Sequence, residues 1–214
     1  MESFVSIDLY SYMRKAETTR YVYFAFHYQR DIWRVQQVKN HWVTKETHKA
    51  AGFFDGSLEE KAKTEGDAAV KRLINKGMNG ASVTCVLIGA ETLNRRWVQY
   101  EIFNSIEEGM GVFGVRIHGL KNKEGKTDSF GVNPFAALGY AVRNDKLHPN
   151  INYTNVGWTD APLNGPISES AAPYLNAKEG FRLDPIFDVY DWCDGDGYNN
   201  FSDWVAKAAK QADR

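Results

Sequence analysis

Short apolar runs alternate along this chain with longer segments of helical periodicity. Residues 21–26 are apolar on both faces, as parallel strands covered by helices are. Residues 82–88 read as a second buried strand and 112–117 as another, and 185–190 complete the set. The sequence therefore predicts at least four strands separated by helices.

Between these runs, apolar residues recur every three or four positions. This spacing predicts helices from 32 to about 42, from 67 to 76, from 95 to 108 and around 201–208. Polar residues 27–31 should form a loop, residues 52–56 a short strand or turn, and residues 7–13 a short helix. Alternating strands and helices predict an α/β fold, with a mostly parallel sheet and helices on both faces.

Two parts of the chain fit this alternation poorly. Residues 1–19 are interpreted as an N-terminal extension to a domain that spans 20–214. Residues 131–182 show little periodicity and several turn signals, among them Asn133-Pro134 and Asn164-Gly-Pro166. Because this stretch is long for a structureless connection, we expect an irregular insertion that has a function or carries short elements of its own.

The composition narrows the classes of function. A formal net charge of -1 argues against nucleic-acid binding, which needs a basic surplus. No apolar run reaches the roughly 18 residues of a membrane span, and no signal-peptide stretch is seen near the start. Cys85 and Cys193 show neither metal-ligand nor disulfide spacing, which favours a reducing, cytoplasmic location. We expect no bound metal.

The most informative residues follow the strand at 82–88. Trp97 and Glu101 are four apart, so they share a helix face just beyond the carboxyl end of a strand. That edge is where ligands bind in open α/β sheets. Trp97 either packs in the core or forms a stacking wall, and Glu101 either flanks the buried face or performs chemistry.

A second group follows the first strand. His27, Tyr28 and Arg30 lie where that strand reaches the same edge, and His27 is either a hydrogen-bonded structural residue or part of a site. A Gly-x-Gly-x-x-Gly match from Gly109 to Gly114 closes a helix and enters a strand. A dinucleotide fingerprint needs the opposite order, so this match is interpreted as a helix stop and a turn.

Taken in order, four segments resemble the TIR-like family. They are Tyr-Val-Tyr-Phe-Ala-Phe-His-Tyr-Gln-Arg-Asp at 21–31, Val-Thr-Cys-Val-Leu-Ile-Gly at 83–89, Trp-Val-Gln-Tyr-Glu at 97–101 and Val-Tyr-Asp-Trp at 189–192. The resemblance covers about residues 20–213 and is strongest to the ThsB-like members, which belong to bacterial Thoeris anti-phage defence systems. It implies a flavodoxin-like fold with a parallel sheet.

The resemblance also implies an activity. Enzymes of this family cleave the bond between nicotinamide and ribose in NAD, and ThsB-like members cyclise the ADP-ribose into a signal that activates a partner effector, ThsA. Glu101 matches the family's catalytic glutamate. The expected substrate-binding residues are Trp97, Phe24, Phe26, His27, Tyr28 and Arg30. NAD is then the substrate, no separate cofactor is expected, and TIR-like domains also associate with one another.

Two alternatives remain open at this stage. TIR-like domains also act as non-catalytic interaction or adaptor modules, and a solvent-facing, tolerant Glu101 would favour that function. A nucleotide-binding flavodoxin-like domain of different chemistry ranks last, because the sequence lacks a phosphate-cradling loop.

Overall fold

The computed structural model describes residues 20–44, 48–50, 64–168 and 179–214. The predictions for the N-terminal extension, for its short helix and for residues 52–56 lie outside the described residues.

The centre of the molecule is a five-stranded sheet in which every neighbouring pair is parallel. Its strand order is β10-β4-β3-β1-β2. The strands are β1 (Arg20–Ala25), β2 (His48–Ala50), β3 (Val83–Ile88), β4 (Gly111–Arg116) and β10 (Val189–Asp191). The prediction of a parallel α/β sheet is confirmed.

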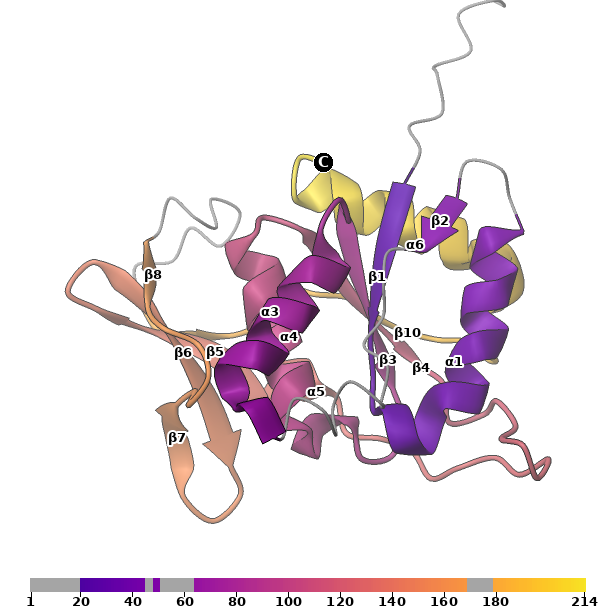
Figure 1. The fold of residues 1–214 in the computed structure, drawn as a ribbon, viewed down its shortest axis with the longest axis horizontal. Coiled ribbons are helices and arrows are strands. Elements are labelled where there is room, and N and C mark those ends of the chain that lie inside the picture. Colours follow the sequence, from indigo (N-terminus) through magenta and orange to yellow (C-terminus); the bar gives the residue numbers. More distant parts are fainter. Residues whose placement is uncertain (1–19, 45–47, 51–63, 169–178) are drawn as a thin grey trace, which may run out of the picture.

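Helices cover both faces of this sheet (Figure 1). On one face lie α1 (Tyr28–Val43) and α6 (Gly197–Gln211), and on the other lie α3 (Asp67–Met78) and α4 (Arg96–Glu107). A single 3-10 turn, η1 (Thr92–Asn94), connects β3 to α4. This is the flavodoxin-like layering that the resemblance implied.

Side chains of β1 alternate between the two helical layers, as the period of two in a strand requires. Val22 and Phe24 pack in the cluster that includes α1 and α6. Tyr23 and Ala25 pack in the opposite cluster, with α3 and α4. The alternation decides which residues of β1 face the helix that carries Glu101.

A second, antiparallel sheet was not predicted. Its order is β7-β6-β5-β9, with β8 paired to β6, and a short helix precedes it. These elements are α5 (Pro134–Ala137), β5 (Leu138–Arg143), β6 (Lys146–Tyr153), β7 (Gly157–Asp160), β8 (Ile167–Ser168) and β9 (Phe181–Arg182). These elements lie in the stretch 131–182, for which we expected an insertion that has a function or carries short elements of its own.

The second sheet lies beyond α3 and α4, on the side away from the parallel sheet (Figure 1). The rings of Phe103 on α4 and Tyr140 on β5 meet edge to face at 5.4 Å. Helix α4 is therefore packed between two sheets. For this reason all nine side chains from Val98 to Ile106 are buried. A surface helix would bury only the side chains of one apolar stripe.

Two predicted boundaries are wrong. Helix α1 begins at Tyr28, so residues 28–31 form its first turn and not a loop. The backbone N–H of Asp31 donates to the carbonyl of His27, and the Asp31 carboxylate lies in the first turn, where the helix dipole favours it. The last strand starts at Val189 and not at 185, because the N–H groups of Ile186 and Phe187 both donate to the Leu183 carbonyl in a helical turn.

Candidate active site

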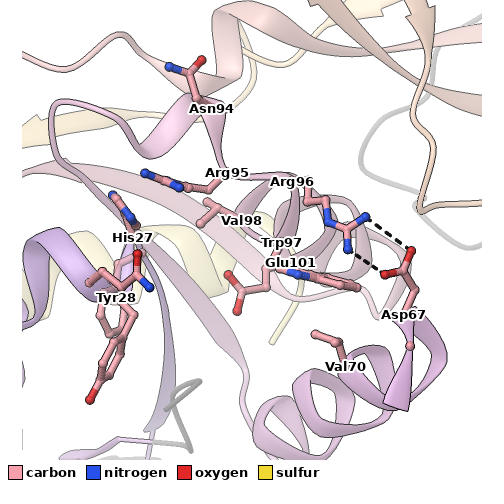
Figure 2. Close-up of a pocket in the computed structure, with 13 residues that line it drawn as sticks. His27, Tyr28, Asp67, Val70, Asn94, Arg95, Arg96, Trp97, Val98 and Glu101 are labelled. Atoms are coloured by element: carbon pink, nitrogen blue, oxygen red, sulfur yellow. Dashed lines mark hydrogen bonds and ion pairs between the residues drawn. The ribbon is translucent and has the colours of Figure 1, made fainter. Parts of the chain in front are cut away.

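A cavity of about 390 Å³ opens at the carboxyl edge of the parallel sheet, beyond β1 and β3 (Figure 2). Its walls come from the loop after β1, the N-terminal turn of α3 and the first two turns of α4. Five of the predicted site residues line it: Phe26, His27, Tyr28, Trp97 and Glu101. Segments more than 60 residues apart in the sequence thus meet in one cavity.

Glu101 is a buried acid on the cavity wall, with an exposed fraction of only 3%. The phenol of Tyr23 donates a hydrogen bond of 2.5 Å to its Oε1 atom. This length is typical of an O–H donor bound to a carboxylate. Burial, together with the neighbouring Glu101, raises the pKa of the Tyr23 phenol well above its usual value, so the phenol remains a donor.

The backbone at Glu101 is anchored as well. Ser105 Oγ, one turn further along α4, donates to the Glu101 carbonyl at 2.6 Å. The same hydroxyl lies 2.7 Å from Thr84 Oγ1 on β3. All of these groups are buried, so the hydrogen bonds hold α4 in a fixed register against β3.

Trp97 forms the wall next to Glu101, and Figure 2 shows its indole beside the carboxylate. The guanidinium of Arg96 lies 4.7 Å from the centre of the indole, in cation–π contact. Arg96 also pairs with Asp67 at the start of α3, with 2.7 Å between Nη2 and Oδ1. The pair joins the two helices across one side of the cavity.

His27 is buried, with an exposed fraction of 7%. Within the described part of the chain, neither of its ring nitrogens has a hydrogen-bond partner. Its Nδ1 lies 3.9 Å from Glu91 Oε2, too far for a hydrogen bond. Burial, and secondly the charge of Arg95, lower the pKa of His27 to about 4. At neutral pH the imidazole is uncharged, with one N–H donor and one acceptor for a ligand.

Two predicted site residues lie outside the cavity. Phe24 is 1% exposed and stacks on Phe201 of α6, with 6.2 Å between the ring centres. It faces the other helical layer because it is one residue from Tyr23 on the strand. Arg30 binds both carboxylate oxygens of Asp128, at 2.8 and 2.7 Å, and Glu91 at 2.9 Å. Its guanidinium is thus held by other residues outside the cavity lining.

Tyr23, Arg95 and Asp67 were not predicted as site residues from the sequence. Tyr23 had a readable signal, since a phenol in a buried strand needs a hydrogen-bond partner and the alternation of β1 turns it toward α4. Arg95 and Asp67 gave no signal, because their place at the cavity depends on how α3 and α4 lie relative to each other.

Among the described residues, no group of three or more His, Cys, Asp or Glu side chains is arranged to hold a metal ion. Across the same parts of the chain, no helix has both the length and the apolar character needed to cross a membrane.

The parallel α/β sheet presents a tryptophan and a buried glutamate one helical turn apart at its carboxyl edge, the arrangement that the resemblance to TIR-like domains implied. Residues 23–122 match the family model described as "Thoeris protein ThsB, TIR-like domain". A protein of Bacillus cereus (strain MSX-D12), named "Putative cyclic ADP-D-ribose synthase ThsB1", is 47% identical over 188 residues, which cover 86% of this chain and 97% of that protein. The chain belongs to the ThsB family of TIR-like proteins.

Proposed function

We propose that this chain is an NAD-cleaving enzyme that releases nicotinamide and cyclises the remaining ADP-ribose into a signalling nucleotide. The observation that carries the proposal is Glu101, a buried carboxylate that faces a cavity next to an aromatic wall. The printed name of the Bacillus cereus relative, a cyclic ADP-D-ribose synthase, supports the same reaction. The adaptor alternative expected a solvent-facing Glu101, which the exposed fraction of 3% does not favour.

The first step breaks the bond between C1′ of the ribose and the ring nitrogen of nicotinamide. The electron pair of that bond leaves with the nitrogen, so nicotinamide departs as a neutral molecule and needs no acid. Positive charge then develops on the ribose, and a carboxylate beside the sugar stabilises it. Glu101 has this role in our proposal, and the hydrogen bond from Tyr23 fixes the direction of its carboxylate.

The second step closes the ring. A hydroxyl of the same ADP-ribose attacks C1′, a new C–O bond forms, and the hydroxyl proton passes to Glu101 or to solvent. The balance is NAD⁺ converted to nicotinamide, cyclic ADP-ribose and one proton. Walls that exclude water favour this internal attack over hydrolysis. Trp97 and Phe26 supply aromatic surface for the nicotinamide or adenine ring, and Tyr28 extends that surface, with its ring centre 6.0 Å from that of Phe26.

Membership of the ThsB family supports a proposal for the wider role. The cyclic product activates a ThsA effector, so the two proteins communicate through a nucleotide and not through direct contact. The enzyme acts in the cytoplasm, in keeping with two free cysteines, Cys85 and Cys193. Copies of the chain associate with one another, as TIR-like domains do.

Replacement of Glu101 by Gln tests the reaction. Glu101→Gln keeps the size of the side chain and removes its charge, and we expect the rate of nicotinamide release to fall by about 10²–10³-fold. Purified protein is incubated with NAD, once in buffer and once in lysate from infected cells. The products are then identified by mass spectrometry. Glu107→Gln, the same change at an exposed position of α4, is the matched control and should keep the parental rate. A Glu101→Gln protein that turns over NAD as fast as the parent refutes the proposal.

A further inference from the structure

The N-terminus of α4 opens at the cavity without the features that usually neutralise a helix start. Arg95 is its N-cap residue, no side chain caps it, and its first turn contains no acidic residue. Helices α1 and α3 differ, since each has an aspartate in the first turn, Asp31 and Asp67. The first N–H groups of a helix have no intrahelical partner, and the helix dipole places partial positive charge there.

Three buried polar atoms without hydrogen-bond partners lie at this same end of the cavity. They are both ring nitrogens of the buried His27 imidazole and the Nε atom of Arg95, whose side chain is otherwise 42% exposed, as judged over the described residues. The other end of the Arg95 side chain is held by Glu91, with 2.8 Å between Nη2 and Oε2. Figure 2 shows the His27 ring and the Arg95 guanidinium on the same side of the cavity. Buried polar groups in proteins nearly always have partners, so these unpaired groups point to a ligand.

The other arginines near the cavity are already engaged. Arg96 is paired with Asp67, and Arg30 binds Asp128 through two hydrogen bonds. Glu91 is shared between Arg30 and Arg95. Arg95 is thus the cavity-lining arginine with an unused buried donor.

The spacing along α4 is compatible with a diphosphate. Arg95 and Glu101 are six residues apart, which is about 9 Å along the helix axis, and helical side chains tilt toward the N-terminus. In NAD, one ribose and its 5′ oxygen separate the scissile C1′ atom from the diphosphate. With that ribose against Glu101, the diphosphate reaches the start of α4.

We propose that the N-terminus of α4, together with Arg95 and His27, binds the diphosphate of NAD. Arg95 contributes charge and its free Nε–H, the helix contributes backbone N–H groups, and His27 contributes a neutral N–H donor. The assignment to NAD rests on the proposed function, whereas the anion site itself is testable without any reaction.

Titration with inorganic pyrophosphate tests the anion site directly. In isothermal titration calorimetry on the full chain, we expect Arg95→Gln to weaken pyrophosphate binding at least about tenfold, and Arg95→Lys to have an intermediate effect. The control is Arg143→Gln, which removes an equal charge from an ion pair on the second sheet and should leave binding unchanged. Equal affinity of the parent and Arg95→Gln, or no binding by the parent, overturns the proposal.

A second titration links the site to the substrate. In a Glu101→Gln background, which prevents turnover, Arg95→Gln should raise the Kd for NAD about 10- to 100-fold. It should change the Kd for nicotinamide riboside, which lacks both phosphates, by less than about twofold. Equal losses for the two ligands would mean that Arg95 only supports the cavity wall, and the proposal would then be wrong.

The two hypotheses fail in different ways. If the parent protein binds pyrophosphate through Arg95 but releases no nicotinamide from NAD, the proposed function is wrong and the anion site stands. If the parent releases nicotinamide and Arg95→Gln leaves NAD affinity unchanged, the function stands and the diphosphate site is wrong.

Discussion

The hydrogen bond between Tyr23 and Glu101 leads to a sharp prediction about catalysis. Tyr23→Phe removes one hydroxyl and keeps the ring, which is fully buried in the core between β1 and α4. Glu101 loses a 2.5 Å hydrogen bond, and its carboxylate is no longer held in one direction. Because Tyr23 does not line the cavity, it acts on the reaction only through Glu101.

The size of the effect follows from that contact. A buried hydrogen bond to a charged group contributes about 1.5–3 kcal/mol. Without this contact the carboxylate must be oriented at a cost in free energy when charge develops on the ribose, so the loss appears in kcat, as a fall of about 10- to 100-fold. KM for NAD should change by less than about threefold, because the cavity wall is intact.

The assay measures initial rates of nicotinamide release by chromatography over a range of NAD concentrations, together with thermal unfolding. Tyr100→Phe is the matched control. It removes a phenol hydroxyl from α4 whose hydrogen bonds go to Asn75 Oδ1 at 3.0 Å and to Asn104 Oδ1 at 3.3 Å. We expect a similar loss of stability and an unchanged kcat. A Tyr23→Phe enzyme with the parental kcat, or one that loses activity only as much as Tyr100→Phe does, refutes the reasoning.

Two further predictions concern stability. The pKa of His27 is lowered on folding from 6.5 to about 4, so the unfolded chain binds more protons between these values and stability falls as the pH drops. Between pH 7 and pH 5, urea denaturation should show the parent losing about 2 kcal/mol more than His27→Gln, and equal losses would contradict the assignment of a buried neutral imidazole. Phe24→Leu should lower the free energy of unfolding by about 1–2 kcal/mol with KM for NAD unchanged, because Phe24 packs against Phe201. A raised KM would instead place Phe24 in substrate binding.

Much of the parallel fold was accessible from the sequence. The apolar runs at 82–88 and 112–117 became β3 and β4, since a strand covered on both faces has a simple pattern. The four-residue spacing of Trp97 and Glu101 placed both side chains in one cavity, because the spacing of a helix is fixed.

The second sheet was not accessible, because its local signals point elsewhere. Strand β6 contains Pro149, which lacks an N–H donor and argues against a strand. Asn133-Pro134 read as a turn, yet Asn133 caps α5 by accepting a hydrogen bond from the Phe135 N–H, with the proline at the first helical position. Strands β8 and β9 have only two residues each, too few for any period to show.

The site residues that were not predicted share one physical reason. Tyr23 and Glu101 are 78 residues apart, and Arg96 and Asp67 are 29 apart. Each pair meets only because a strand and a helix, or two helices, pack in one particular register. Local periodicity gives the face on which a side chain lies, but it does not give the partner opposite.

The position of α4 between two sheets limits how copies of this chain can dock. A surface helix in such a fold would leave its outer side free for a neighbouring molecule. Here β5 and its partner strands already occupy that side, with Tyr140 against Phe103. The association of copies proposed above would therefore use other surfaces, such as the exposed Trp33 on α1 or Tyr198 on α6. A signal passed between copies would reach Glu101 through the loops at the carboxyl edge and not by displacement of its helix.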